Sequence, residues 1–281
     1  MSSFGKRVLT TVITVPSIFC IIFFLPKNFY LAFTILVMAA TTIGAMELKQ
    51  LYKKAEGTDL NIEPWMVALL PLAKWLETAY FPEFPLLNLI LVLLAIMIYS
   101  RELFVGVKDG FSKTFSRLGG SSLLIIYPGL LMTFLIRITE FPHASALLIL
   151  FFLLVFSNDS FAFLFGMGFG RNNKGLFAVS PNKSIAGFLG GLFMTILLSA
   201  LYCSFVPEIQ SEISLLQAIL LGIVTSTGAN IGDLIESAFK RSAKVKDSGT
   251  IVPGRGGLLD SLDSIMASAP LFYLMLAFFL I

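Results

Sequence analysis

The chain has 281 residues, of which 57% are hydrophobic and 13% charged. Soluble domains are about 45–50% apolar and about 25% charged, so this composition excludes an ordinary soluble protein, as does the mean hydropathy of +0.88. A net charge of +3 is too small to indicate a nucleic-acid partner. Cys20 and Cys203 both lie in apolar runs, which argues against a disulfide framework or a zinc site.

Long apolar runs predict an all-α polytopic membrane protein with about nine transmembrane helices, since each crossing needs about 20 apolar residues. The first run lacks a small-residue cleavage site, so we expect a retained helix and not a signal peptide. The third run is the weakest, because Lys74 and Glu77 interrupt it; the alternative is a segment in the interface. The predicted spans are 8–25, 29–46, 65–81, 86–99, 121–138, 144–165, 185–206, 215–235 and 258–281.

Loop charge predicts the orientation, because cytoplasmic loops carry an excess of Lys and Arg. With the N-terminus in the cytoplasm and the C-terminus on the outer side, most of the 20 basic residues fall in inner loops. We expect one integrated membrane domain, with N-terminal helices and an amphipathic cytoplasmic loop in residues 1–120 and the catalytic helices in residues 121–281.

The inner loop 101–117 repeats apolar residues at Phe104, Val107, Phe111 and Phe115 among basic ones. This spacing predicts a helix lying in the membrane surface. The alternative is a solvated linker.

Four carboxylates lie near the inner ends of predicted spans: Asp159, Asp233, Asp260 and Asp263. A carboxylate within a membrane costs about 2.5–3.5 kcal/mol, so it needs a partner or a wet cavity and is a functional candidate. Their similar depth predicts one site reached from the cytoplasm. The alternative is four separately satisfied interfacial residues.

A basic, glycine-containing stretch connects the eighth and ninth spans. Lys and Arg neutralise phosphate, glycines let backbone N–H groups approach, and flanking carboxylates hold Mg²⁺. The stretch therefore predicts a site for a polyphosphate with a divalent ion. An ordinary positive-inside loop would explain the charges but not the glycines. The candidates are Lys240, Arg241, Lys246, Asp247, Gly254, Arg255, Gly256 and Gly257.

A second basic loop, with Ser180, Lys183 and Ser184, precedes the seventh span. These residues are placed to cap that helix and present its N-terminus to an anion, although any helix start benefits from a cap. The sole histidine, His143, falls on the predicted outer side, so inner-face chemistry has no His base. An already ionised nucleophile, such as a phosphate monoester, needs none.

The stretch SAFKRSAKVKDSGTIVPGRGGLLDSLD, residues 237–263, closely resembles the signature of the phosphatidate cytidylyltransferases, or CDP-diacylglycerol synthases. Supporting matches are Asn158-Asp159-Ser160, the Ser180 to Ser184 run and Gly232-Asp233. The resemblance covers about residues 155–265. The N-terminal half agrees only in length, basic start and span pattern.

The resemblance implies an enzyme that joins CTP and phosphatidic acid into CDP-diacylglycerol and pyrophosphate for phospholipid synthesis, using Mg²⁺ and, in some members, a monovalent cation such as K⁺. By matching positions, Asp233 and Asp260 resemble metal ligands, and with Lys246 and Asp247 they make the implied catalytic set. The implied binding residues are Asp159, Ser180, Lys183, Ser184, Lys240, Arg241, Gly254, Arg255, Gly256 and Gly257.

The same resemblance implies a multi-pass protein of the bacterial inner membrane, among membrane lipids, with its active site facing the cytoplasm. It leaves a homodimer open. The family usually has His where Arg255 stands, Arg where Ser261 stands, and an acidic or amide residue where Ala186 stands. We expect an active variant with a repositioned Arg, with altered substrate preference or an inactive relative as alternatives.

Two other functions fit parts of this pattern. One is a CTP-dependent transferase or kinase acting on another lipid. The other is an ion-coupled transporter, which also places carboxylates and broken helices in the membrane. The outer halves of the predicted spans are nearly free of carboxylates, which favours a one-sided enzyme.

Overall fold

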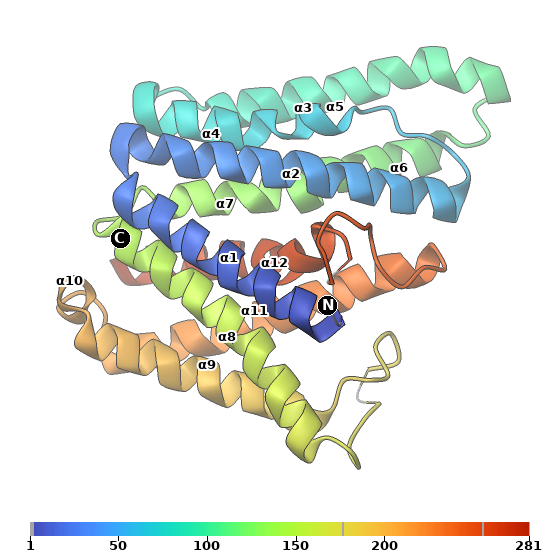
Figure 1. Cartoon of the computed structure of the whole chain (residues 1–281). Coiled ribbons are helices and arrows are strands. Elements are labelled where there is room, and N and C mark those ends of the chain that lie inside the picture. The colour runs from blue at the N-terminus through green and yellow to red at the C-terminus, as the bar shows by residue number, and fades with distance from the viewer. Residues whose placement is uncertain (1–2, 176, 255, 281) are drawn as a thin grey trace. The chain divides into compact units, whose positions relative to one another are not determined.

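The computed structural model describes residues 3–175, 177–254 and 256–280, with the side chains of residues 3–11 left out. The regular elements of this described part are helices, which agrees with the predicted all-α fold (Figure 1). In chain order they are α1 (Ser3–Phe24), α2 (Lys27–Glu56), α3 (Pro64–Val67), α4 (Leu69–Tyr80), α5 (Leu86–Val105), the 3₁₀ helix η1 (Gly106–Asp109), α6 (Thr114–Leu124), the π-helix η2 (Ile125–Leu130), α7 (Leu131–Ile138), α8 (Ala144–Phe169), α9 (Ile185–Phe205), α10 (Pro207–Gln210), α11 (Leu215–Ser242) and α12 (Leu259–Leu280).

The chain divides into two compact units, each described by itself below. Unit 1 comprises Met1–Arg137 and Phe239–Leu262, and unit 2 comprises Ile138–Ala238 and Asp263–Ile281. Helices α11 and α12 each belong partly to both units. The predicted single membrane domain with a boundary near residue 120 stays a prediction.

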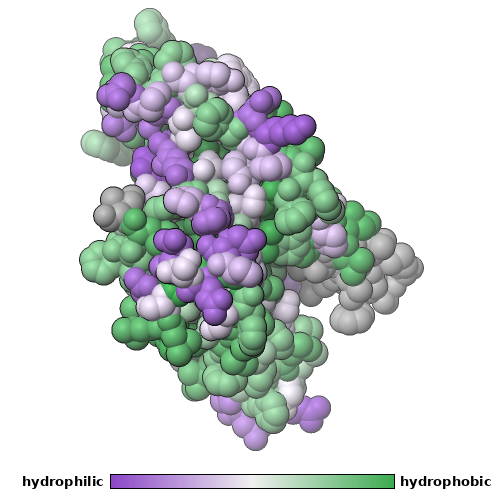
Figure 2. All heavy atoms as spheres, turned by 90° about the vertical axis from the view of Figure 1, so that its left-hand side faces the viewer, coloured by the Kyte–Doolittle hydropathy of each residue, from purple (hydrophilic) through white to green (hydrophobic). Residues whose placement is uncertain are grey.

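Seven helical segments of the described chain are long and apolar enough to cross a membrane, so the protein is an integral membrane protein. Large apolar side chains are widely exposed, and Figure 2 shows hydrophobic residues over much of one face, with hydrophilic residues gathered in patches. The predicted orientation and the count of nine stay predictions. The seven segments are Lys27–Glu56, Leu86–Asp109, Thr114–Ile138, Ala144–Phe169, Ile185–Phe205, Leu215–Ser242 and Leu259–Leu280.

The predicted third span is not one continuous helix. It divides into the short helices α3 and α4 at Ala68, which lies four residues after Pro64 and three before Pro71. Proline lacks an N–H and its ring clashes with the carbonyl four residues earlier, so Pro71 explains why α3 ends at Val67. The expected pair within α4 is present, with Lys74 Nζ 2.8 Å from Glu77 Oε1.

The loop 101–117 is not a separate surface helix, so that prediction is wrong. Helix α5 continues to Val105, η1 follows, and α6 begins at Thr114. Buried Arg117 holds the turn together, because its guanidinium contacts Glu102 Oε1 at 2.5 Å and Asp109 Oδ2 at 2.6 Å. The side chains of Phe104 and Phe115 nevertheless remain exposed.

The buried side of α11 carries small residues, among them Gly228 and Gly232. In unit 2, a Cβ on Gly228 would lie 2.8 Å from the Cα of Ser268, and one on Gly232 would collide with the Asp263 carbonyl. Ser268 Oγ also donates to the Thr225 carbonyl at 3.1 Å. Small residues therefore let α11 and α12 approach closely within this unit.

Candidate functional site

In unit 1, the carboxylate of Asp260 is the centre of a hydrogen-bonded cluster. Lys240 Nζ lies 2.6 Å from Oδ1. The N–H and the hydroxyl of Ser248 each donate to Oδ2 at 2.9 Å, and the Gly257 N–H donates at 2.7 Å. The side chains of Lys240 and Asp260 are only 16% and 8% exposed. The signature residues at both ends of the α11 to α12 connection thus meet at one carboxylate.

Glycines let the connection between α11 and α12, here called the signature loop (residues 243–258), close on Asp260. Val252 and Gly256 exchange backbone hydrogen bonds of 2.8 and 3.1 Å. Gly254 and Gly256 have φ of 83° and 111°, which side-chain-bearing residues rarely adopt. A Cβ on Gly256 would also lie 2.7 Å from Asp260 Oδ2. Arg255, another predicted site residue, lies outside the described residues.

Sequence reasoning missed Glu47, a residue of α2 whose carboxylate lies against the signature loop. Glu47 is 3% exposed. It accepts hydrogen bonds from the Leu259 N–H at 2.7 Å, the Leu258 N–H at 3.0 Å and the Ser248 hydroxyl at 3.2 Å. The available signal was a carboxylate one residue beyond the end of a predicted span, but its partners lie more than 200 residues away.

The other predicted residues of this region stay at the surface. Arg241 is exposed in the last turn of α11, and Lys246 and Asp247 are exposed in the signature loop. The predicted roles of these three residues stay predictions. Ser261 carries a buried hydroxyl without a hydrogen-bond partner among the described residues.

In unit 2, two predicted site residues pair directly. Lys183 Nζ lies 2.7 Å from Asp233 Oδ2, with the two side chains 24% and 40% exposed. Ser237 Oγ approaches the other oxygen of Asp233 at 3.5 Å, which is a weak contact. Asp233 is therefore more open to solvent than Asp260.

The predicted helix cap before α9 is confirmed. Ser184 is the N-cap residue, and its hydroxyl accepts a hydrogen bond from the Gly187 N–H at 3.0 Å. Ser180 begins the turn that leads there, because its carbonyl accepts from the Lys183 N–H at 3.1 Å. Lys183 directly precedes this cap residue.

A group of carboxylates also gathers in unit 2. Buried Asp263 is within electrostatic range of Asp233, Asp159 and Glu236. Asp159 is exposed and accepts a hydrogen bond from Ser264 Oγ at 3.4 Å. Among the described residues, no three potential ligand side chains converge closely enough to hold a metal by themselves.

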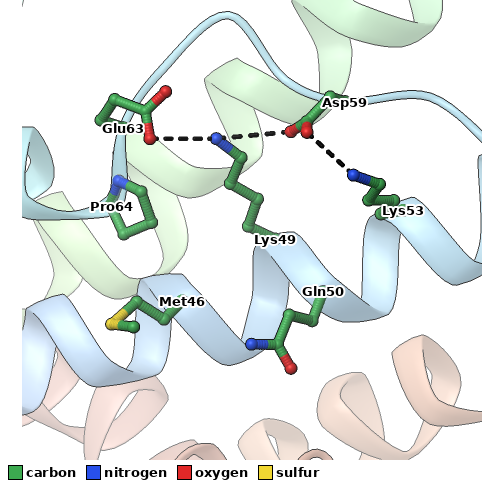
Figure 3. Close-up of a pocket in the computed structure, with 7 residues that line it drawn as sticks. All are labelled: Met46, Lys49, Gln50, Lys53, Asp59, Glu63 and Pro64. Atoms are coloured by element: carbon green, nitrogen blue, oxygen red, sulfur yellow. Dashed lines mark hydrogen bonds and ion pairs between the residues drawn. The ribbon is translucent and has the colours of Figure 1, made fainter.

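A polar pocket of about 320 Å³ in unit 1 contains none of the predicted site residues (Figure 3). Lys49 lies 3.3 Å from both Asp59 and Glu63, and Lys53 lies 3.1 Å from Asp59. Burial tends to raise the pKa of Asp59, but the Leu60 N–H and the two lysines outweigh it and lower that pKa. The charges in this pocket neutralise one another.

Comparisons with known proteins identify the family. The chain matches the Cytidylyltransferase family over residues 5–279. It is 32% identical over 253 residues to the phosphatidate cytidylyltransferase of Bacillus subtilis (strain 168), which covers 89% of this chain and 90% of that protein. It is 44% identical over 125 residues to the phosphatidate cytidylyltransferase of Staphylococcus epidermidis (strain ATCC 35984), covering 44% and 46% of the two chains. It is 34% identical over 180 residues to the uncharacterized protein YnbB of Escherichia coli (strain K12), covering 63% and 59%. The chain belongs to the cytidylyltransferase family.

Proposed function

We propose that this protein is a phosphatidate cytidylyltransferase, which makes CDP-diacylglycerol and pyrophosphate from CTP and phosphatidic acid. The observation that carries the proposal is the cluster in unit 1, where Lys240, Ser248, Gly257 and Asp260 are held together by direct hydrogen bonds. These residues belong to the stretch that resembles the family signature. The name and the 90% coverage of the Bacillus subtilis relative support the same reaction.

In this reaction a phosphate oxygen of phosphatidic acid attacks the α-phosphorus of CTP. A new P–O bond forms, the bond from the α-phosphorus to the bridging oxygen breaks, and pyrophosphate leaves with that oxygen. The attacking phosphate is ionised at neutral pH, because its second pKa is about 6, so no His base is required. The work of the protein is to position the phosphates and to stabilise their charge.

The lysines in both units suit this task. In unit 1, Lys240 and the exposed residues Arg241 and Lys246 offer positive charge to phosphate oxygens. In unit 2, Lys183 stands directly before the N-cap residue of α9, where the helix N-terminus also favours an anion. We assign Lys183, Ser180 and Ser184 to the substrate phosphate. We assign the signature loop, which includes Asp247, to the nucleotide.

The carboxylates of unit 2 fit a divalent cation in their chemistry. Asp233 is 40% exposed, and its carboxylate is a hard oxygen donor. Mg²⁺ commonly uses one or two carboxylates and completes its shell with water and substrate phosphates, so three converging side chains are not required.

In unit 1, Asp260 Oδ2 accepts three hydrogen bonds and Oδ1 lies 2.6 Å from Lys240 Nζ. Its carboxylate is a hard oxygen donor of the kind that Mg²⁺ prefers. We propose Asp233 and Asp260 as Mg²⁺ ligands. When bound, Mg²⁺ would supply charge neutralisation to the phosphates. A second, monovalent cation such as K⁺ is proposed on the family resemblance alone.

We further propose that the protein lies in the bacterial inner membrane with its N-terminus and active site facing the cytoplasm. The inner-loop excess of basic residues supports this orientation, and the bacterial relatives support the location. A homodimer stays a prediction, which the mass of the detergent-solubilised protein would test.

The test is an assay of purified protein in detergent with Mg²⁺, phosphatidic acid and CTP labelled at the α-phosphate. We expect label in a CDP-lipid together with release of pyrophosphate. Glu212→Gln, at an exposed carboxylate of unit 2 away from the proposed site, is a matched control for Asp233→Asn and should keep full activity. Release of CDP with a phosphorylated lipid would indicate a kinase instead, and no reaction with any lipid would favour the transporter alternative.

A further inference from the structure

Glu47 caps the start of α12 from a different helix. Helix α12 begins at Leu259, and the first N–H groups of a helix have no partner within it. The Glu47 carboxylate of α2 accepts hydrogen bonds from the Leu258 and Leu259 N–H groups, at 3.0 and 2.7 Å. A negative charge at this position also interacts favourably with the helix dipole.

The two capped residues directly precede Asp260. A shift or fraying of the first turn of α12 would therefore move the Asp260 carboxylate. The hydroxyl of Ser248 strengthens this link, because it lies 3.2 Å from Glu47 Oε2 and 2.9 Å from Asp260 Oδ2. One serine thus connects the capping carboxylate to the proposed metal ligand.

Two positions of the signature loop have no room for a side chain because Glu47 lies against them. A Cβ on Gly249 would collide with Glu47 Oε1, and a Cβ on Gly257 would collide with Glu47 Oε2. By contrast, Lys49, two residues further along α2, points into the polar pocket of Figure 3. The face of α2 that carries Glu47 is therefore the one fitted to the signature loop.

We propose that Glu47 is a positioning residue for the transfer reaction, which holds the first turn of α12 and the signature loop so that Asp260 is fixed in its working geometry. This inference rests on the proposed function. It assigns a role to the N-terminal half of the chain, where the sequence resemblance assigned no site residue. Glu47 acts through Ser248, Leu258 and Leu259 and has no contact of its own with substrate in this proposal.

The experiment compares Glu47→Gln and Glu47→Ala with the control Glu56→Gln, which alters an exposed carboxylate on the same helix. The amide of Gln offers one acceptor oxygen where the carboxylate offers two, so it loses part of the cap, and Ala loses all of it. We expect kcat to fall about 10- to 100-fold in Glu47→Gln, or about 1.4–2.7 kcal/mol, and further in Glu47→Ala. The control should retain wild-type kcat.

Hydrogen exchange supplies a readout that does not depend on activity. We expect faster exchange of the Leu258 and Leu259 amides in the Glu47 variants, with unchanged exchange in α4 and α5 of the same unit. Unaltered exchange at these two amides would overturn the proposal, as would wild-type kcat in Glu47→Ala. Equally faster exchange throughout unit 1 would also overturn it, because it would assign Glu47 to general stability.

A double-mutant cycle separates positioning from an independent effect. If Glu47 acts partly through Ser248, then Glu47→Gln and Ser248→Ala should be non-additive in kcat, with the double variant less impaired than the product of the two single effects. Strict additivity would remove Ser248 from the proposed link. If the wild-type protein makes no CDP-lipid, the proposed function fails, whereas the exchange experiment still decides whether Glu47 holds the loop.

Discussion

Replacing each proposed metal ligand by asparagine should abolish turnover in both cases but lower stability much more in one than in the other. Asn can present one carbonyl oxygen, so in Asp260→Asn an amide N–H₂ must face either Lys240 or the three donors to Oδ2. Breaking a buried ion pair costs about 3–5 kcal/mol. Asp233 is 40% exposed, and loss of its pair with Lys183 should cost only about 0–1 kcal/mol.

At roughly 2–3 °C per kcal/mol for a chain of this size, Asp260→Asn should lower the apparent Tm by about 6–15 °C, and Asp233→Asn by about 3 °C or less. Thermal denaturation in detergent measures this difference, and the labelled CTP assay measures turnover. A residual rate above about a tenth of wild type, a barrier change under about 1.4 kcal/mol, would remove that residue from the metal site. An equal fall in Tm for both variants would refute the burial argument.

Four further outcomes follow from single side chains. Gly257→Ala should lose most activity and about 1–3 kcal/mol of stability through overpacking, whereas Gly119→Ala, with open space around its Cβ, should keep both in the same assays. Arg117→Lys should lower Tm, because Lys cannot bridge two carboxylates bidentately. It should change kcat/KM little, because Arg117 pairs with Glu102 and Asp109, which are not site residues. If Lys183 binds a substrate phosphate, Lys183→Met should raise the KM for that substrate about tenfold or more, which corresponds to about 1.4 kcal/mol of binding free energy. An unchanged KM for both substrates would exclude that role. The pKa of Asp59 is lowered in the folded state, so its contribution to folding stability is present above its ordinary value of 3.8 and is lost as pH falls through the folded-state value. Asp59→Asn should therefore cost less than about 1 kcal/mol of folding stability at pH 7 and nothing in acid. Denaturation at a series of pH values measures this.

Apolar runs predicted the long helices well, because burial of about 20 apolar residues in lipid needs no knowledge of tertiary partners. The failures occur where the rest of the fold decides. Helix α2 continues past the predicted end at residue 46, since the charged residues there find partners such as Asp59 for Lys53. The surface helix expected in loop 101–117 is replaced by a turn, because Arg117 pairs with carboxylates on the preceding segment.

The site shows the same division. The signature stretch and the cap at Ser184 were predictable, because fixed spacing and cap chemistry are local properties. The pair between Lys183 and Asp233 joins residues 50 positions apart, and no local pattern pointed to that partner. Glu47 was overlooked because a lone carboxylate after an apolar run resembles an ordinary loop residue until the chain from Ser248 to Leu259 is placed against it.

The distance in sequence between Glu47 and its partners has a consequence for how the protein is made. Its two N–H donors are 211 and 212 residues further along the chain. At roughly 5–20 residues per second, a ribosome needs about 10–40 s to synthesise that length. During this time α2 carries a carboxylate whose hydrogen-bond donors do not yet exist. Unit 1 cannot be completed until the segment Phe239–Leu262 has been synthesised, so the N-terminal helices must be kept from misassembly by the insertion machinery or by the lipid during this interval.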